Sequence, residues 1–485
     1  MKKIFFIFCI FLFFPTFIPS QTLILPFENK SNNKNFSWIS ESISYSLEFF
    51  FDNYNLEIIS QEERNQIFEE FQIPFSIPFS KATMIKLGNR AKASKILYGE
   101  FKIEDEKIYI KGESIELKNI KPKEIVSVEG ELKSLIFLQN LLAWKILNNE
   151  IHIEEKNGEE FLKKYSDIPL SSWENFIKGM IAKEKDKKES FFKKSLENFQ
   201  HFPFALWEIS KLYFQKSEYE KSLNYLMLLK GNEDFAYKSS FLLAMNFYNL
   251  ERFERAIEIL NRILKDTKNK DIIYNNIGVC YAKLNNNEKA LEYFNMALDT
   301  KKSADYFFNK SLVAENTDEC FDNLKNSLQI NHLDFNFHNF LYNKLIKNNL
   351  DFIAKKELEI IKMYFSKEPD KKIDNSLNFL KIPNILFAEN SSEVPDKNVS
   401  RSYIEFALNS IKNKDYHKAI TEIKKAIYAS PYESYNYYLL GWVYFHLKLH
   451  KNALEEIEFS LWLKEDPEVR SLYQKLRSES NNLRV

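Results

Sequence analysis

Residues 271–304 read DIIYNNIGVCYAKLNNNEKALEYFNMALDTKKSA and place small residues, Gly278 and Ala290, where two helices would approach closely. Each has a counterpart earlier in the chain, because Ala244 precedes Gly278 and Ala256 precedes Ala290 by the same interval. Small residues at two fixed phases of one period, here about 34 residues, are typical of a helical-hairpin repeat. The sequence therefore predicts a solenoid in which each hairpin packs on its neighbours.

This repeat resembles the tetratricopeptide repeat (TPR) family. In residues 271–304 the resemblance rests on large and small residues at the family's positions, namely Tyr274, Ile277, Gly278, Tyr281, Ala290, Phe294 and Ala297. We predict TPR-like hairpins over residues 171–365, with divergent first and last copies. Two further hairpins are predicted over residues 401–480, where Ala407 and Gly441 are again one repeat period apart.

Residues 366–400 separate the two clusters of hairpins. They contain Pro369, Pro383 and Pro395 and the polar stretch 390–393. Prolines and polar clusters between periodic segments are typical of connections. We therefore predict a linker here, and whether the two clusters form one continuous superhelix stays open.

The first twenty residues predict a signal peptide. Lys2 and Lys3 precede eleven uninterrupted apolar residues, Ile4 to Phe14, and the sequence PTFIPS follows at residues 15–20. About 20 apolar residues are needed to span a bilayer, so this run is too short for an ordinary anchor. We expect cleavage near Ser20 and an exported protein, periplasmic or associated with the outer membrane. An uncleaved anchor is the alternative.

Residues 22–150 predict a small α/β module. Apolar runs at 22–27 and 56–59 predict strands with helices after them, and three more strands are expected between residues 96 and 131. Ser60 and Ser80 are predicted to cap the helices that follow them. With the hairpins that follow, the chain is predicted to be α+β overall, with a small N-terminal α/β module followed by an all-α TPR-type solenoid.

This module also resembles a known family. The sequences LILPFEN at 23–29 and ASKILYGE at 93–100 resemble motifs of the TolB-amino-terminal-like module, which is related to CsgG-type and FlgO-type envelope proteins. The resemblance implies a bacterial envelope protein whose module mediates assembly. Charged residues in the hairpin 102–118 suit a solvated sheet better than lipid, which argues against a pore.

Composition excludes several functions. The chain has 485 residues, 68 basic against 68 acidic side chains, and only nine glycines, none of which frames a phosphate-binding loop. Zero net charge argues against nucleic-acid binding. His446 and His450 have metal-compatible spacing on one predicted helical face but lack further ligands. We predict no enzyme activity, cofactor or metal, and buried free thiols at Cys280 and Cys320.

The TPR resemblance implies which residues line the inner groove. The fifth, ninth and twelfth positions of each first helix carry over to Trp207, Lys211, Phe214, Phe241, Met245, Tyr248, Asn275, Val279, Ala282, Ile404, Leu408, Ile411, Tyr438, Trp442 and Phe445. Aromatic residues dominate the set and charges are few, so we expect a groove that binds apolar or aromatic peptide segments. Each residue could instead pack on the α/β module, the 366–400 segment or a neighbouring hairpin.

These inferences favour a non-catalytic exported scaffold or adaptor that binds protein or peptide partners, envelope components above all, through the TPR groove. The alternative is an assembly subunit of an outer-membrane export or surface-organelle complex that acts through the N-terminal module. Neither a nucleic acid nor a small-molecule substrate is expected. The identity of the partner and the oligomeric state do not follow from the sequence.

Overall fold

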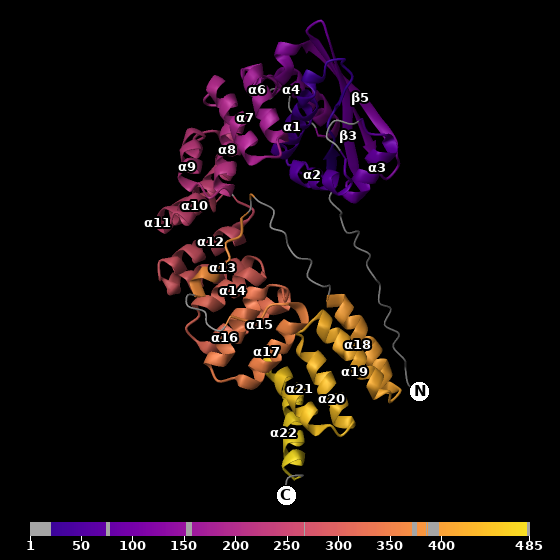
Figure 1. Cartoon of the computed structure of the whole chain (residues 1–485), viewed down its shortest axis with the longest axis vertical. Helices are drawn as coiled ribbons and strands as arrows, with labels where there is room; N and C mark the ends of the chain where they lie inside the picture. Colours follow the sequence, from indigo (N-terminus) through magenta and orange to yellow (C-terminus); the bar gives the residue numbers. More distant parts are fainter. Residues whose placement is uncertain are drawn as a thin grey trace, which may run out of the picture. The chain divides into compact units, whose positions relative to one another are not determined.

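A computed structural model of the chain describes residues 21–73, 78–151, 158–265, 267–370, 376–384, 386 and 397–482 (Figure 1). The predicted signal peptide lies outside these residues. The chain divides into two compact units, Met1–Ser239 and Ser240–Val485. The predicted fold class, α+β with a helical solenoid, is confirmed. Among the described residues, no helix combines the length and apolar character needed to cross a bilayer.

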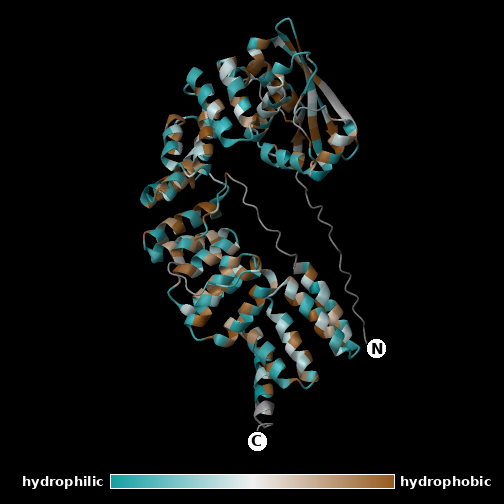
Figure 2. Ribbon diagram, viewed as in Figure 1, coloured by the Kyte–Doolittle hydropathy of each residue, from teal (hydrophilic) through white to brown (hydrophobic). Residues whose placement is uncertain are grey.

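The first unit begins with a mixed sheet of five strands in the order β1-β3-β4-β5, with β2 also paired to β3. The strands are β1 (Thr22–Ile24), β2 (Glu28–Asn29), β3 (Lys95–Glu104), β4 (Lys107–Glu116) and β5 (Lys121–Glu131). β1 and β2 run parallel to β3, whereas β3, β4 and β5 form an antiparallel meander. Figure 2 shows apolar and polar residues mixed along both the strands and the helices.

The predicted strand at residues 56–59 is wrong, since only an isolated bridge joins Ile58 to Thr22. Gly99 of β3 is a position that requires glycine. A Cβ atom there would lie 2.2 Å from the carbonyl oxygen of Lys111 and 2.2 Å from the ring of Phe27. The sheet can therefore close over Phe27 only without a side chain at this position.

Helices α1 (Trp38–Asn53), α2 (Gln61–Glu70), α3 (Lys81–Arg90), α4 (Leu135–Glu150) and α5 (Gly158–Lys163) complete the module. Ser60 and Ser80 cap α2 and α3 as predicted, because their hydroxyls accept hydrogen bonds from the backbone N–H of Glu63 and Thr83. Such caps satisfy donors that have no partner within the helix.

A buried arginine ties α1, α2 and β1 together. Arg64 lies 2.7 Å from Glu41 and 3.0 Å from Glu48, and it also donates to the carbonyl oxygen of Ile24. Burial raises the pKa of Glu48 to about 7 although Arg64 opposes this. The group is structural, since its polar atoms are directed into the module's own core.

The first hairpins belong to the same unit as the module. They comprise α6 (Leu170–Ile181), α7 (Lys185–Asn198), α8 (Pro203–Gln215) and α9 (Tyr219–Leu228). Trp173 of α6 donates from its indole nitrogen to Ser42 of α1 at 2.6 Å. The ring of Tyr45 lies 5.1 Å from that of Phe176 and 5.8 Å from that of Phe204. Module and hairpins therefore share one aromatic core.

No strand occurs among the described residues of the second unit, and α10 crosses the boundary between the units. Its helices are α10 (Ala236–Asn249), α11 (Phe253–Ile263), α12 (Lys270–Lys283), α13 (Asn287–Thr300), α14 (Ala304–Val313), α15 (Thr317–Ile330), α16 (Phe335–Lys347), α17 (Asp351–Tyr364), α18 (Lys397–Lys412), α19 (Tyr416–Ala429), α20 (Ser434–His446), α21 (His450–Leu463) and α22 (Pro467–Asn482). Even-numbered α12 to α20 are the first helices of hairpins, and odd-numbered α13 to α21 are the second.

The repeat period appears in both packing and backbone. A Cβ atom on Gly278 would lie 2.7 Å from the ring of Phe294, so glycine permits the close approach that the sequence predicts. Ser217, Glu251 and Asn285, each one period after the last, follow the ends of first helices with a positive φ of 58° to 59°. The same left-handed step therefore reverses the chain in successive hairpins.

The two predicted clusters of hairpins share one core without stacking end to end. Lys356 of α17 lies 2.7 Å from Glu456 of α21, and Lys325 of α15 donates to the carbonyl oxygen of Trp462. The C-terminal hairpins thus contact the middle hairpins through their second helices. A fully buried cluster of His338, Glu357 and Tyr432 lies at the same junction.

Candidate functional site

In the first unit, the predicted groove residues already have partners. Trp207 is buried, and its ring lies 6.0 Å from that of Phe235. Lys211 forms an ion pair of 2.9 Å with Glu208 and lies 5.7 Å from the Trp207 ring. Phe214 is half-buried, with its ring 5.5 Å from that of Tyr219. These side chains contribute to packing within the unit.

At the start of the second unit, α10 also buries most of its predicted groove residues. Phe241 and Met245 are buried, and the Met245 sulfur lies 3.9 Å from the amide nitrogen of Asn276. Tyr248 is half-buried beside Phe253, with 5.6 Å between the ring centroids. Of these three side chains, only Tyr248 retains appreciable exposure.

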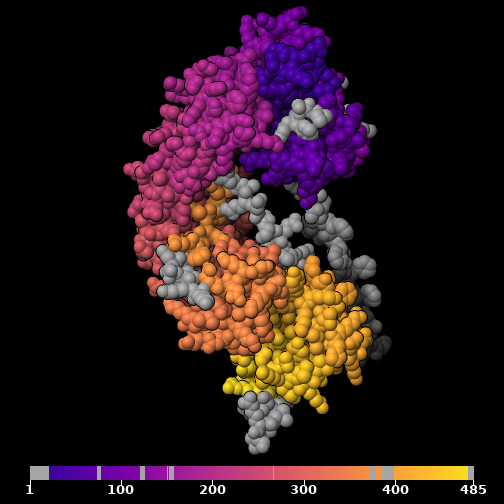
Figure 3. Space-filling view, viewed as in Figure 1, coloured from indigo at the N-terminus to yellow at the C-terminus, as the bar shows by residue number. Residues whose placement is uncertain are grey.

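The inner face of α12, α14 and α16 is occupied by the chain itself. Asn275, Val279 and Ala282, the predicted groove residues of α12, are fully buried. Residues 376–384, which follow α17, lie against this face and contribute the buried side chain of Leu380. Figure 1 shows this orange segment beside α12, and in Figure 3 orange residues remain visible at the surface next to the reddish hairpins.

Asparagine side chains bind the main chain of this segment. Asn309 of α14 accepts from the N–H of Lys381 at 2.7 Å and donates to its carbonyl oxygen at 2.6 Å. Asn275 donates to the same carbonyl at 3.1 Å, and Asn276 donates to the carbonyl of Pro383 at 3.0 Å. Both polar groups of one peptide residue are therefore recognised by helices α12 and α14.

Side-chain contacts add to these main-chain bonds. The ammonium group of Lys381 lies 2.7 Å from Asp334 and 5.3 Å from the ring of Phe337, at the start of α16. Closer to α17, the N–H of Asp370 donates to Asn339 at 2.9 Å, and Asn343 donates to the Asp370 carbonyl. The chain thus returns along α16, α14 and α12 in turn.

This placement changes the interpretation of the predicted linker. Residues 366–370 and 376–384 fill part of the inner face of the middle hairpins, in addition to connecting α17 to α18. For Asn275, the alternative of packing on the 366–400 segment holds. Asn309 and Asn339 were absent from the predicted set, although Asn309 lies one repeat period after Asn275 and that spacing could have found it.

The C-terminal hairpins differ, because their inner face retains exposed apolar side chains. Leu408 is 42% exposed and Tyr435 is 44% exposed, and Tyr438, Trp442 and Phe445 are half-buried. Ile404 is buried and Ile411 is half-buried in the same core. A hollow of about 400 Å³ lies beside Tyr435 and is also lined by Ser400, Arg401, Ile404, Glu405, Ser430, Glu433 and Asn436.

Aromatic and histidine rings extend this face along α20. The Trp442 and His446 rings lie 3.7 Å apart, and Phe445 lies 6.1 Å from His450. His446 ends α20 whereas His450 begins α21, so the prediction that they share one helical face is wrong. The turn at 447–449 separates them. No group of three or more potential metal ligands occurs among the described residues.

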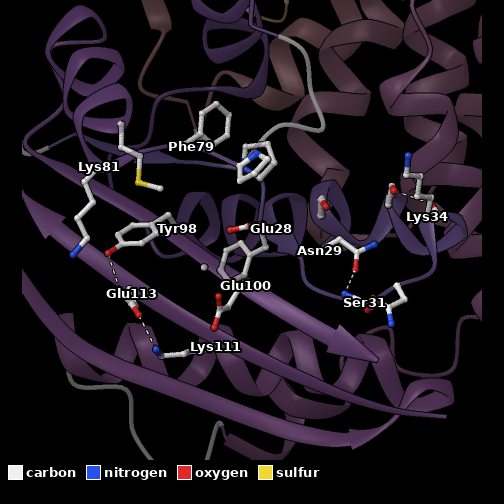
Figure 4. A pocket seen from close by; sticks show the side chains of 18 residues that line it. Glu28, Asn29, Ser31, Lys34, Phe79, Lys81, Tyr98, Glu100, Lys111 and Glu113 are labelled. Atoms are coloured by element: carbon white, nitrogen blue, oxygen red, sulfur yellow. Dashed lines mark hydrogen bonds and ion pairs between the residues drawn. The ribbon is translucent and has the colours of Figure 1, made fainter. Parts of the chain in front are cut away.

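The α/β module contains a second, polar pocket of about 580 Å³ (Figure 4). Tyr98 donates to Glu113 at 2.7 Å, and Lys111 lies 2.9 Å from the same carboxylate. These hydrogen bonds lower the pKa of Glu113, while burial and the Glu113 hydrogen bond raise the pKa of Tyr98. The pocket's Glu113 is thus a satisfied carboxylate, a state that favours structure over proton transfer.

Cys280 and Cys320 are buried free thiols, as predicted. Burial raises the pKa of Cys280 to about 12 and also raises that of Cys320. A thiolate is the reactive form of cysteine, so neither thiol is activated as a nucleophile.

Comparisons with known proteins agree with the repeats seen in the structure. A tetratricopeptide repeat family model matches residues 250–303. The match covers helices α11, α12 and α13. A curated relative, the uncharacterised protein RP472 of Rickettsia prowazekii (strain Madrid E), is 26% identical over 185 residues, which are 37% of this chain and 51% of the relative. The chain thus matches about half the length of that relative.

Two solved TPR structures are among the similar proteins. A tetratricopeptide repeat protein from Parabacteroides merdae is 14% identical, with a TM-score of 0.30 over 57% of this chain and 99% of its own. YrrB, described as a TPR protein with an unusual peptide-binding site, is 11% identical, with a TM-score of 0.24 over 59% of this chain and 97% of its own.

Proposed function

We propose that this TPR protein is a non-catalytic protein-interaction scaffold that binds a partner on the inner face of its C-terminal hairpins. The observation that carries the proposal is the exposure of Leu408 and Tyr435 there, beside the half-buried Tyr438 and Trp442. The corresponding positions of α12 are buried beneath residues 376–384. Of the described groove positions, those on α18 and α20 are the most accessible to another protein.

The surface suits an apolar or aromatic peptide segment with polar flanks. Leu408 and Tyr435 offer apolar area, and Arg401 and Glu405 line the neighbouring hollow with charges of both signs. Apolar anchors surrounded by polar groups are typical of protein interfaces. A peptide that places one large apolar side chain in the hollow would use both features.

Panning a displayed peptide library on the purified chain tests this function. The variant Leu408→Glu with Tyr435→Ala should lose the peptides that wild type enriches, because both side chains are exposed and a charge replaces apolar area. The matched control is Leu449→Glu, an equally exposed leucine in the turn between α20 and α21. If both variants recovered the wild-type ligands equally well, the C-terminal hairpins would not be the binding face.

Export and an envelope location are also part of the proposal. They are supported by the sequence of residues 1–20 and by the motifs at 23–29 and 93–100. Fractionation of cells that produce the full chain, with an antibody to its C-terminus, would check them. Recovery in the cytoplasm at full length would contradict export.

The second candidate is an assembly subunit that acts through the α/β module. The polar pocket that Lys34, Lys81 and Glu100 help to line favours it, because it is a concave surface of the module itself. Lys81→Glu together with Lys34→Glu should abolish self-assembly or envelope association of the full chain. A monomer that behaves identically with and without these changes would count against this role.

A further inference from the structure

The inner face of α12, α14 and α16 has the features of a peptide-binding surface, and its present ligand is internal. We propose that this face binds extended peptides carrying a lysine between apolar residues, and that residues 376–384 occupy it until such a peptide from a partner protein displaces them. This surface is separate from that of the C-terminal hairpins, so neither proposal depends on the other.

The first argument is the main-chain recognition. Asn309 makes both hydrogen bonds that a neighbouring β-strand residue would make to Lys381, one to its N–H and one to its carbonyl. Every peptide residue except proline offers this pair of groups. A surface that binds the main chain accepts many sequences, and pockets for particular side chains then add selectivity.

The second argument is the charge and apolar pattern around that residue. Asp334 pairs with the ammonium group of Lys381, and the ring of Phe337 lies beneath it. Leu380 is buried, and Ile382 packs on the same core. The segment NFLKIP, residues 378–383, therefore defines the chemistry that the face recognises: an apolar residue, then lysine, then a second apolar residue.

The third argument is the polar character of the face beneath the segment. Asn275, Asn276 and Asn309 are fully buried, and their amides donate to Lys381 and Pro383. A face that served only as a core would be expected to carry apolar side chains, since buried amides are costly without partners. These amides need a bound main chain, whether internal or external.

The fourth argument is that most side chains of the segment remain partly exposed. Among its described side chains Leu380 alone is buried, while Leu377, Phe379, Lys381 and Ile382 are half-buried. Most of the segment is therefore in contact with solvent as well as with the face.

The covalent connection of residues 376–384 to the chain determines how strongly they compete with an external peptide. An internal ligand on a short connection has an effective concentration on the order of millimolar. An external peptide with the same contacts binds more weakly to wild type than to an unoccupied face, because residues 376–384 leave the face in only a fraction of the molecules. Weakening the internal segment should raise the affinity for external peptides without altering the face itself.

The test uses the full chain and a fluorescently labelled peptide, SLNFLKIPN, which copies residues 376–384. In the chain variant Lys381→Glu, the internal segment should be repelled by Asp334, and anisotropy should show at least tenfold tighter peptide binding than wild type. Adding Asn309→Leu to this variant should remove that gain. Lys301→Glu, an exposed change at the end of α13, is the matched charge control and should behave as wild type.

A charge exchange tests the side-chain contact. The variant Asp334→Lys should bind a peptide with glutamate in place of its lysine at least tenfold better than the original peptide, and wild type should show the reverse preference. Equal affinity of Lys381→Glu and wild type for SLNFLKIPN would overturn the proposal. A dimer in light scattering that dissociates on peptide addition would also overturn it, because the external ligand would then be a second copy of this chain.

Hydrogen exchange on the wild type gives a readout that needs no variant. Excess peptide should speed exchange of the amides at 376–384 while α12 and α14 keep their protection, since only the internal segment leaves the face. Exchange at 376–384 that stays as slow as in those helices at every peptide concentration would identify the segment as a permanent part of the core.

Discussion

The middle hairpins α12–α17 and the C-terminal hairpins α18–α21 share one repeat length but differ in their inner faces. In α12, the fifth and ninth positions, Asn275 and Val279, are fully buried, and Asn275 donates to the chain's own segment. In α18, the ninth position is Leu408, which is 42% exposed. The repeat fixes how helices pack in a hairpin and leaves the use of the inner face to a few side chains.

The largest expected effect comes from the junction between these two regions. There, the Nδ1 of His338 lies 2.7 Å from Glu357, and the Tyr432 hydroxyl donates to the same carboxylate at 2.5 Å. Glu357→Leu would leave both buried groups without this partner and should lower the free energy of unfolding by about 3–5 kcal/mol. Urea denaturation of the full chain measures it.

Glu359→Leu, an exposed position on the same helix, is the control and should change stability by less than about 0.5 kcal/mol. If both variants unfolded at the same urea concentration, the buried cluster would not hold the C-terminal hairpins to the middle ones.

A second prediction concerns pH and gives the two compact units opposite responses. Burial, and then the nearby His338, lower the pKa of His332 from 6.5 to about 4. The folded second unit therefore binds fewer protons than the unfolded chain between these pH values. Its free energy of unfolding should decrease by up to about 3 kcal/mol as pH falls from 6.5 to 4. His332→Leu should remove this decrease, which can be measured as the melting temperature at each pH.

In the first unit, burial raises the pKa of Glu48 from 4.5 to about 7. Its folded state binds more protons than the unfolded chain between these values, so stability should fall by up to about 3 kcal/mol as pH rises from 4.5 to 7. Glu48→Gln should flatten that slope. If both variants changed the pH profile in the same direction, one of the two assignments would be wrong.

The third prediction tests what the two regions share. Gly278→Ala and Gly441→Ala each place a Cβ atom 2.7 Å from a facing side chain, Phe294 in one hairpin and Ile457 in the other. Each should cost about 1–2 kcal/mol, because overpacking outweighs the better helix propensity of alanine. Thermal unfolding of the two variants measures it, and clearly unequal losses would show that the hairpins are packed differently.

Gly112→Ala is the control for added volume. A Cβ atom there meets its nearest neighbour at 3.6 Å, an ordinary contact distance. Its expected cost is smaller than that of either helical glycine.

The last prediction tests the difference between the inner faces directly, and its exposed variant should have the smallest effect. Val279→Ala removes apolar volume from a fully buried ninth position and should cost about 2 kcal/mol. Leu408→Ala, at the exposed ninth position of α18, should change the free energy of unfolding by less than about 0.5 kcal/mol. Equal losses in chemical denaturation would mean that Leu408 is covered in solution.

The fold could be predicted where a local pattern dictates packing. Gly278 and Ala290 revealed the hairpin because a helix seam needs small residues whatever lies elsewhere in the chain. The caps at Ser60 and Ser80 were predicted for a similar reason, since the bond spans three residues. The predicted strand at residues 56–59 was wrong because this short run pairs only with Thr22 of β1, through one isolated bridge.

The site was harder to predict, because its contacts join residues far apart in sequence. The bond from Asn309 to Lys381 spans 72 residues, and that from Asn276 to Pro383 spans 107. No periodic pattern encodes such a pairing. Aromatic residues at the inner positions suggested a groove, yet Trp207 and Phe241 became core because neighbouring chain segments covered them.

The returning segment also has a mechanical consequence. In an ordinary repeat array each hairpin contacts only its neighbours, so stability is nearly a sum of nearest-neighbour terms and the ends fray first. Here one stretch of chain bonds α16 through Asp370 and both α14 and α12 through Lys381. It works as a tie across three successive hairpins, which makes them unfold together as a single cooperative block in the middle of the solenoid.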